Sequence, residues 1–164
     1  MRIALLLILL FGASSAALAY DANGVRLGAS ESAVTDAFPS AHCQPLEWKS
    51  TAADRRCDDA RIEFAGVRAR VTFYLKHDAV QAFSIRFNPN DRERVVRYLK
   101  ARYGEPKSER TDTFRREGKP DRQVYKVRWE SGRDKALLSV QLSRRRAQLE
   151  VSRGNFEQEI YRVK

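Results

Sequence analysis

The sequence has little of the material from which catalytic and cofactor sites are built. Its 164 residues include two histidines, two cysteines and eight glycines. The glycines form neither a G-x-G-x-x-G nor a G-K-[ST] motif, which excludes the common phosphate cradles of nucleotide-binding enzymes. His42 and His77 fall in expected loops, away from any candidate nucleophile, so neither is assigned as a general base. We therefore expect no catalytic residue, no bound metal and no cofactor, and interpret the chain as non-enzymatic.

Long hydrophobic runs are absent after residue 19. Within residues 1–19, Arg2 precedes an apolar run that ends in Ala17-Leu18-Ala19. This arrangement is typical of a secretory signal peptide, and the run is short for a membrane span. The alternative is an N-terminal core helix or membrane anchor. We expect cleavage between Ala19 and Tyr20, which releases a periplasmic or secreted protein with no transmembrane segment. No cysteine lies near that point, so we expect no lipoprotein.

The two cysteines, Cys43 and Cys57, could be a redox pair, metal ligands or a structural disulfide. A redox pair needs a C-x-x-C type of spacing, which the chain lacks. A metal site could recruit His42, Asp58 and Asp59, but this spacing matches no known ligand frame. Because thiols persist as disulfides in an oxidising compartment, we predict a structural disulfide, worth about 3 kcal/mol for a loop of this length.

Basic residues outnumber acidic residues, which affects the kind of binding partner that we expect. The formal net charge is +10, and loss of Arg2 with the leader lowers it to +9. In a cytosolic protein this excess would indicate nucleic acid. Export instead favours anionic lipid, lipopolysaccharide or an acidic protein, and we expect no nucleic-acid partner. The basic residues are mostly arginine, which an arginine-rich genome explains equally well without any function.

The sequence resembles itself at an offset of 67 residues. Residues 69–88 align with residues 136–155, and each segment has two alternating apolar runs around a polar turn, the pattern of a β-hairpin. A helical pattern precedes each hairpin. We therefore predict one domain over residues 20–164 with two pseudo-repeats, 24–88 and 89–155, and a short C-terminal helix. The predicted fold class is α+β, a two-layer arrangement of tandem helix-plus-antiparallel-meander repeats with the helices on one face of the sheet.

Two helices precede the hairpins. The first follows Ser30, a good N-cap, and stops at Pro39. The second begins at Asn90, which we expect to cap with Glu93, and ends at Gly104. Residues 110–123 have no periodic pattern and are interpreted as a mobile loop or as an irregular strand with a long turn.

The expected strands have one apolar and one polar face. Alternation places Val71 and Phe73 on the core side, and the side chains between them toward solvent. The polar face and the tip of the second hairpin together supply the candidate partner-binding residues, which are Arg68, Arg70, Tyr74, Arg86, Lys126, Arg128, Arg144, Arg145 and Arg146. An ordinary solvated sheet face explains the same charges, because exposed strands are commonly charged.

Two short motifs resemble known envelope proteins. "VRLGASESAVTDAFP" is similar to the opening of BamE-like outer-membrane assembly lipoproteins, and "VVRYLKARYGEP" is similar to a helix ending found in such modules. The duplicated arrangement also resembles the fold of β-lactamase inhibitor protein, which binds a partner protein. The likeness implies an envelope location. The resemblance does not extend to the mature N-terminus, where this chain has Tyr20 in place of a lipidated cysteine. No binding residue of either kind of protein can be assigned to a position in this chain.

These observations predict an exported binding module. The first hypothesis is protein–protein interaction in the cell envelope, with Arg68, Arg70 and Arg128 as charged contacts and Tyr74 as an apolar anchor on an acidic partner. The second is binding of anionic lipid or lipopolysaccharide by the same basic face and the tip at 144–146. An enzyme is the third alternative.

Overall fold

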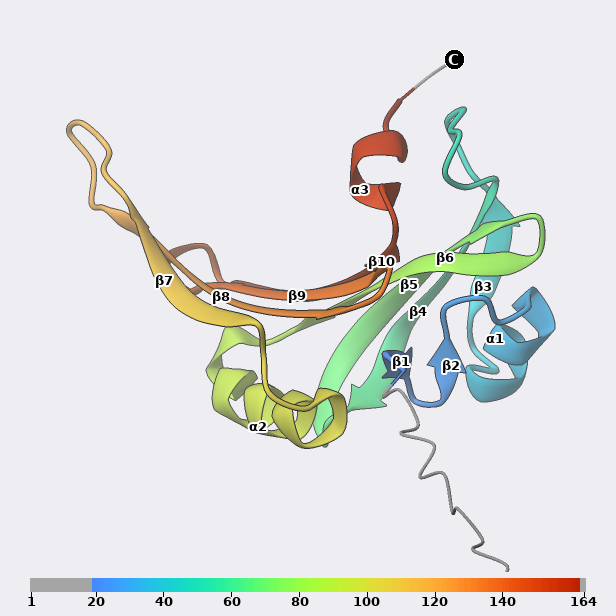
Figure 1. The fold of residues 1–164 in the computed structure, drawn as a ribbon, viewed down its shortest axis with the longest axis horizontal. Coiled ribbons are helices and arrows are strands. Elements are labelled where there is room, and N and C mark those ends of the chain that lie inside the picture. The colour runs from blue at the N-terminus through green and yellow to red at the C-terminus, as the bar shows by residue number, and fades with distance from the viewer. Residues whose placement is uncertain (1–18, 163–164) are drawn as a thin grey trace, which may run out of the picture.

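A computed structural model describes residues 19–162 of the chain (Figure 1). The expected signal peptide, residues 1–19, lies outside the described residues except for Ala19. No helix between residues 19 and 162 combines the length and the apolar character needed to cross a membrane.

One antiparallel sheet of eight strands dominates the molecule (Figure 1). Its strand order is β3-β4-β5-β6-β10-β9-β8-β7, so that β6 and β10, which are distant in the chain, lie side by side at the centre. The strands are β3 His42–Pro45, β4 Arg55–Phe64, β5 Val67–Lys76, β6 Ala79–Phe87, β7 Ser108–Phe114, β8 Arg122–Ser131, β9 Asp134–Gln141 and β10 Arg146–Arg153.

The remaining elements lie on the two sides of this sheet. Helices α1 and α2 and the β1–β2 hairpin are on one side, and α3 is on the other (Figure 1). We call the side of α1 and α2 the inner face and the opposite side the outer face. The bounds are β1 Asp21–Ala22, β2 Val25–Arg26, α1 Glu31–Ala37, η1 Pro89–Asp91, α2 Arg92–Tyr103, η2 Leu142–Arg144 and α3 Phe156–Glu159, where η marks a 3₁₀ turn.

The inner face carries the main hydrophobic core. Val71, Phe73 and Leu75 of β5 are buried, while the two residues between them in the strand are half-buried. Val34 of α1 and Leu99 of α2 are fully buried in the same cluster. This burial pattern confirms the alternation that the sequence predicts for the strand. Burial of apolar area determines which face of a strand turns inward.

The predicted fold class is wrong. The described chain is 49% strand and 20% helix, with three short helices, and it forms an eight-stranded sheet plus a two-stranded one instead of helix-plus-meander repeats. Strands β3 and β7 and the first half of β4 carry many charged or polar residues, so that no apolar alternation marks them. The helices are also not confined to one face, because α3 packs on the outer face in a small cluster of its own. The proposed pseudo-repeats, 24–88 and 89–155, stay a prediction.

The helix boundaries agree with the sequence in part. The Ser30 hydroxyl accepts a hydrogen bond from the amide of Ala33 at 3.2 Å, as expected of an N-cap. Gly104 ends α2 with a φ of 80°, a conformation that glycine adopts without a steric cost. The predicted cap by Asn90 is wrong. The turn η1 precedes α2, and the side chain of Asn88 accepts a hydrogen bond from the amide of Asn90.

Candidate functional site

The outer face carries the basic residues that alternation places there. Arg68 and Arg70 of β5 and Arg86 of β6 are exposed, as is Arg128 of β8, while Lys126 is half-buried. Their strand neighbours on the other face are buried, except for the half-buried Tyr125 beside Lys126, so the predicted face of these residues is confirmed. The tip residues Arg144 to Arg146 lie where η2 passes into β10.

Arg70 and Arg86 are direct cross-strand partners. Side chains in this relationship have Cβ atoms about 5 Å apart, and like charges placed there destabilise the strand pair. The Nε–H of Arg86 donates to the side-chain oxygen of Gln148 at 3.1 Å, which fixes the guanidinium without neutralising it. The sheet therefore holds two positive charges side by side.

The register that produces this pair is set near the β5–β6 turn. His77 and Asp78 both have positive φ, 48° and 59°, as in the two-residue type I′ turns of β-hairpins. An irregularity then shifts the pairing, so that Leu75 faces Val80 but Tyr74 faces Ala82. The extra residue on β6 gives this strand pair the register in which Arg70 lies opposite Arg86.

A hollow of about 450 Å³ lies at this end of the outer face. Five arginines line it, together with small or neutral residues, and no carboxylate is among the lining residues. We call it the arginine hollow and define it by its basic residues, Arg68, Arg70, Arg86, Arg145 and Arg146. Arg145 has a φ of 47°, and its amide donates to the carbonyl of Leu142 at 3.0 Å. Left-handed backbone at a residue other than glycine costs about 1 kcal/mol or more and is often found at functional sites.

The arginines of the hollow have carboxylates near them, but no direct ion pair among the described residues. Asp58 lines a neighbouring hollow together with Arg70 and Arg86, and Glu150 accepts a hydrogen bond from the same Gln148 that binds Arg86. Within residues 19–162 none of the five forms an ion pair with a carboxylate at 4.0 Å or closer. Glu63 lies across the strand from Arg68 but does not reach it within that distance. At the other end of the outer face, by contrast, Lys126 pairs with Asp112 at 2.9 Å and Arg128 with Glu130 at 2.5 Å.

The candidate residues are therefore not all brought together. Lys126 and Arg128 line a separate hollow of about 330 Å³ that also contains Glu157. The hydrogen bond from Lys126 lowers the pKa of the Asp112 carboxyl, which keeps that carboxylate charged beside the lysine. Arg144 lies in η2, next to Arg145 along the chain. Sequence reasoning missed Gln148, because no local pattern reveals that β10 pairs with β6.

The sequence predicts that Tyr74 is open to solvent on the outer face. In the structure its side chain is half-buried instead. Its ring packs on Phe156 of α3, with centroids 5.5 Å apart, beside Ala82 and the segment that carries Ala52 and Ala53. Burial raises the pKa of its hydroxyl. The proposed apolar anchor for a partner is thus already covered by the chain's own C-terminal helix.

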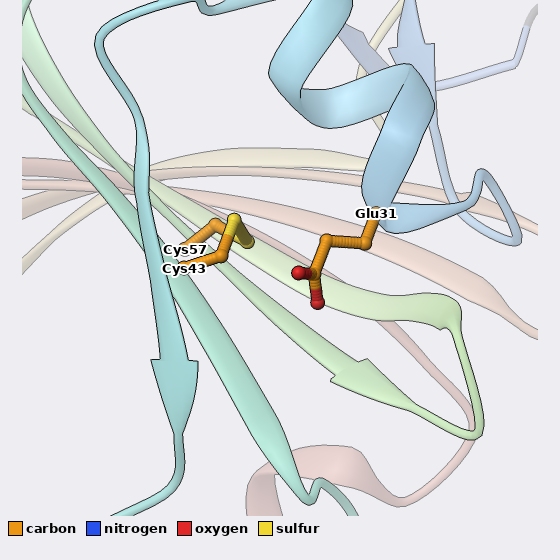
Figure 2. A group of neighbouring side chains, drawn as sticks. All are labelled: Glu31, Cys43 and Cys57. Carbon is orange, nitrogen blue, oxygen red and sulfur yellow. A yellow bond between two sulfur atoms is a disulfide. The ribbon is translucent and has the colours of Figure 1, made fainter.

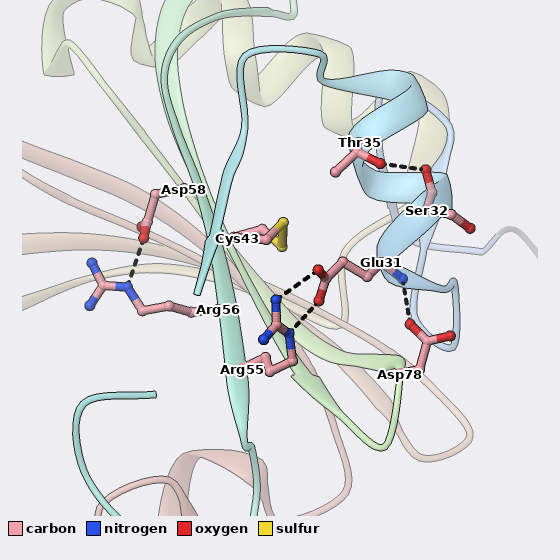
Figure 3. The surroundings of a disulfide bond; sticks show 9 residues. Glu31, Ser32, Thr35, Cys43, Arg55, Arg56, Asp58 and Asp78 are labelled. Atoms are coloured by element: carbon pink, nitrogen blue, oxygen red, sulfur yellow. Dashed lines mark hydrogen bonds and ion pairs between the residues drawn. A yellow bond between two sulfur atoms is a disulfide. The ribbon is translucent and has the colours of Figure 1, made fainter. Parts of the chain in front are cut away.

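The predicted disulfide between Cys43 and Cys57 is confirmed. It joins the directly opposed residues of β3 and β4, with Cα atoms 4.0 Å apart, and lies toward α1 on the inner face (Figure 3). Glu31 points toward the two sulfur atoms (Figure 2), and the three side chains offer ligand atoms within 4.8 Å of one another. The sulfurs are bonded to each other, however, and the Glu31 carboxylate accepts two hydrogen bonds from Arg55, at 2.5 and 2.8 Å (Figure 3).

The alternative metal set is divided between the two faces of the sheet. His42 pairs with Asp58 across β3 and β4, and Asp58 accepts hydrogen bonds from Arg56 and Thr72 on the outer face. Asp59 is paired with Val71 and is buried on the inner face. These side chains therefore cannot converge on one ion without a change of register.

In comparisons with known proteins, no protein-family model, no curated protein and no solved structure matches the chain.

Proposed function

We propose that the chain is an exported, non-enzymatic binding module that holds an anionic ligand of the cell envelope, such as a lipid or lipopolysaccharide headgroup, in the arginine hollow. The observation that carries this proposal is the pairing of Arg70 with Arg86 beside three further arginines, with no carboxylate in the lining. Such an arrangement costs stability in the free protein, and an anion that enters the hollow removes the cost.

The composition of the hollow supports a charged headgroup over a protein as the first candidate. Protein interfaces are usually centred on buried apolar or aromatic anchors, and their cores are depleted of charged residues. Tyr74, the aromatic residue expected to serve as an anchor, is covered by Phe156. The polar groups at the hollow are five arginines and Asn88, and guanidinium groups bind anions by charge-assisted hydrogen bonds.

An acidic envelope protein is the second candidate, and the shape of the outer face favours it. The sheet curves, and the β7–β8 hairpin rises at one end of it (Figure 1). The cross-strand row of Arg70 and Arg86 continues through the neutral residues Gln148 and Ser139, and it ends in a second basic pair, Lys126 and Arg110, near that hairpin. A convex protein surface with carboxylates could contact both ends at once.

The test compares two double charge reversals. Arg70→Glu/Arg86→Glu changes the hollow, and Arg26→Glu/Arg97→Glu makes the same change of charge at exposed residues of β2 and α2 on the other side of the sheet. Sedimentation with vesicles that contain lipopolysaccharide and anionic phospholipid is measured at low and moderate salt. We expect the hollow variant to lose at least about tenfold in affinity and the control to keep it, because each basic residue near an anionic surface contributes about 1 kcal/mol.

The same variants distinguish the two candidates. If the protein fails to bind any vesicle at low salt, but a purified acidic envelope protein cross-links to it in a manner that depends on Arg70 and Arg86, the second candidate replaces the first. If both double variants behave like the wild type in both assays, the hollow is an ordinary solvated face and the proposed function is wrong.

A further inference from the structure

Four of the five arginines of the hollow, all except Arg145, are ordered in two parallel rows that cross the sheet. The first row is the cross-strand pair Arg70 and Arg86. Immediately beside it, on the inner face, lies the row Ala69, Phe87 and Ala147, which are partners across β5, β6 and β10. Because successive residues of a strand point to opposite faces, the next row returns to the outer face.

That next row contains Arg68 on β5, Asn88 just after β6 and Arg146 at the start of β10. All three line the hollow. Alternate residues of a strand are about 7 Å apart, so the two rows are separated by roughly that distance. The Asn88 side-chain oxygen accepts from the amide of Asn90 at 3.0 Å, which leaves its NH₂ group as a donor between the two arginines.

Neutralising the positive charges of the hollow takes more negative charge than a few isolated carboxylates supply. Five of the described arginines line the hollow. The neighbouring carboxylates are Glu63, across the strand from Arg68, and Asp58, which lines a second hollow with Arg70 and Arg86 but is hydrogen-bonded to Arg56. A phosphate monoester carries a charge of about −1.5 to −2 and three acceptor oxygens, whereas a carboxylate carries a single charge and two oxygens. Two phosphate groups, which together carry about three to four negative charges, therefore come close to balancing the hollow, whereas three or four carboxylates would be needed in the same space.

Size agrees with this charge count. The hollow of about 450 Å³ falls in the range of small-molecule sites, about 300–1,000 Å³. Each row offers its own guanidinium groups, whose planar forks suit two oxygens of one phosphate. In the first row, Gln148 occupies the Nε–H of Arg86 and leaves its two terminal nitrogens for a ligand.

We infer that the arginine hollow binds a ligand with two neighbouring phosphate groups, a diphosphate or two phosphomonoesters within about 7 Å of each other, with one phosphate on each row. This inference rests on the proposed function and names the chemical class of its ligand. The diphosphate is either a free solute or the headgroup of an envelope lipid.

Calorimetric titration of the purified protein with inorganic pyrophosphate, orthophosphate and citrate tests the inference. The solutions are matched in ionic strength and held well above the second phosphate pKa of about 6. We expect pyrophosphate to bind at least about tenfold more tightly than orthophosphate and than citrate, the carboxylate control. Arg70→Gln and Arg146→Gln, which each remove a charge from one row, should each reduce the preference for pyrophosphate, whereas Arg97→Gln on α2 should leave it unchanged.

The source of the diphosphate is tested with vesicles. Phosphatidylcholine vesicles are doped either with a polyprenyl diphosphate or with phosphatidylglycerol, which presents isolated phosphodiesters. Retention on the diphosphate vesicles alone assigns a lipid ligand, and binding of soluble pyrophosphate without retention on vesicles assigns a solute. Both results support the inference.

Equal affinity for pyrophosphate and citrate, or for pyrophosphate and orthophosphate, would overturn it. If that result is found while Arg70→Glu/Arg86→Glu still abolishes envelope binding, only the choice of ligand is wrong and the proposed function stands. If the double reversal also leaves envelope binding intact, both fail together.

Discussion

The guanidinium of Arg102 donates two hydrogen bonds to the carboxylate of Asp21, at 2.8 and 2.9 Å, and thereby ties α2 to the β1–β2 hairpin. The Asp21 side chain is only 2% exposed, and it also accepts the amide of Gly24 at 2.7 Å. The beginning of the described chain is thus anchored to the inner layer of the fold.

Arg102→Gln should destabilise the protein through this anchor. The substitution leaves a buried carboxylate short of two charge-assisted hydrogen bonds, and because Arg102 is itself half-exposed, we expect a loss of about 1.5 kcal/mol in the free energy of unfolding. Urea denaturation measures it. Arg97→Gln, an exposed position of the same helix, is the control and should change stability by less than about 0.5 kcal/mol. Equal effects of the two substitutions would show that the contact between Arg102 and Asp21 does not contribute to the free energy of unfolding.

Removal of the disulfide should lower stability without affecting the ligand. The bond closes a loop with a sequence separation of 14 residues. The double substitution Cys43→Ala/Cys57→Ala should therefore cost about 3 kcal/mol. The sulfurs lie toward the inner face, away from the arginine hollow, so pyrophosphate affinity under folding conditions should be unchanged. A selective loss of affinity in a variant that still unfolds cooperatively would contradict this separation.

Phe156 should protect Tyr74 from solvent. Phe156 is 8% exposed and belongs to the small outer-face cluster that covers the tyrosine ring. Phe156→Ala should lower the free energy of unfolding by about 3 kcal/mol and increase the rate of Tyr74 iodination, followed by mass spectrometry. Exposed Tyr161 supplies an internal reference. An unchanged rate at Tyr74 would mean that α3 does not cover it.

Alkaline pH should destabilise the fold through Tyr103. Burial strongly raises the pKa of its hydroxyl, which donates to the carbonyl of Asp21 at 2.9 Å. In the unfolded chain a tyrosine loses its proton near pH 10, so above that pH the folded state retains a proton that the unfolded state has lost. Stability must then fall as pH rises beyond about 10.

The comparison with Tyr103→Phe isolates this effect. Urea denaturation of both proteins between pH 8 and 11 should show a steeper decline for the wild type, with the lines converging at the alkaline end. Parallel declines would assign the pH dependence to other groups, such as Tyr125, whose pKa burial also raises.

The sequence predicts strands well where one face is apolar. In β5, the alternation of Val71 and Phe73 with polar residues is sufficient to assign the strand and its buried face. It does not predict β4, because Arg55, Arg56 and Asp58 interrupt the apolar pattern and are satisfied by partners that only the fold supplies, such as Glu31 for Arg55. The error in fold class follows from such strands, since each undetected strand raises the apparent share of helix and loop.

The sequence predicts on which face of the sheet the site residues lie, but it does not predict which of them come together. Alternation places Arg68 and Arg70 on the outer face of β5. That Arg86 lies opposite Arg70 depends on the register shift near the turn, and that Arg146 joins them depends on the pairing of β10 with β6. Neither long-range pairing has a local signature, and for the same reason the covering of Tyr74 by α3 could not be foreseen.

In the proposed function, Arg70 and Arg86 oppose each other with no direct ion pair until an anion binds. The most direct test is the free energy of unfolding of Arg70→Gln against the wild type, in low-salt buffer with and without pyrophosphate. Without pyrophosphate, the variant should be more stable by about 0.5 kcal/mol, because a like-charge cross-strand pair is removed. With pyrophosphate, the wild type should gain stability and overtake the variant. A variant that is less stable than the wild type without the anion, or that gains as much stability from it, would contradict the account.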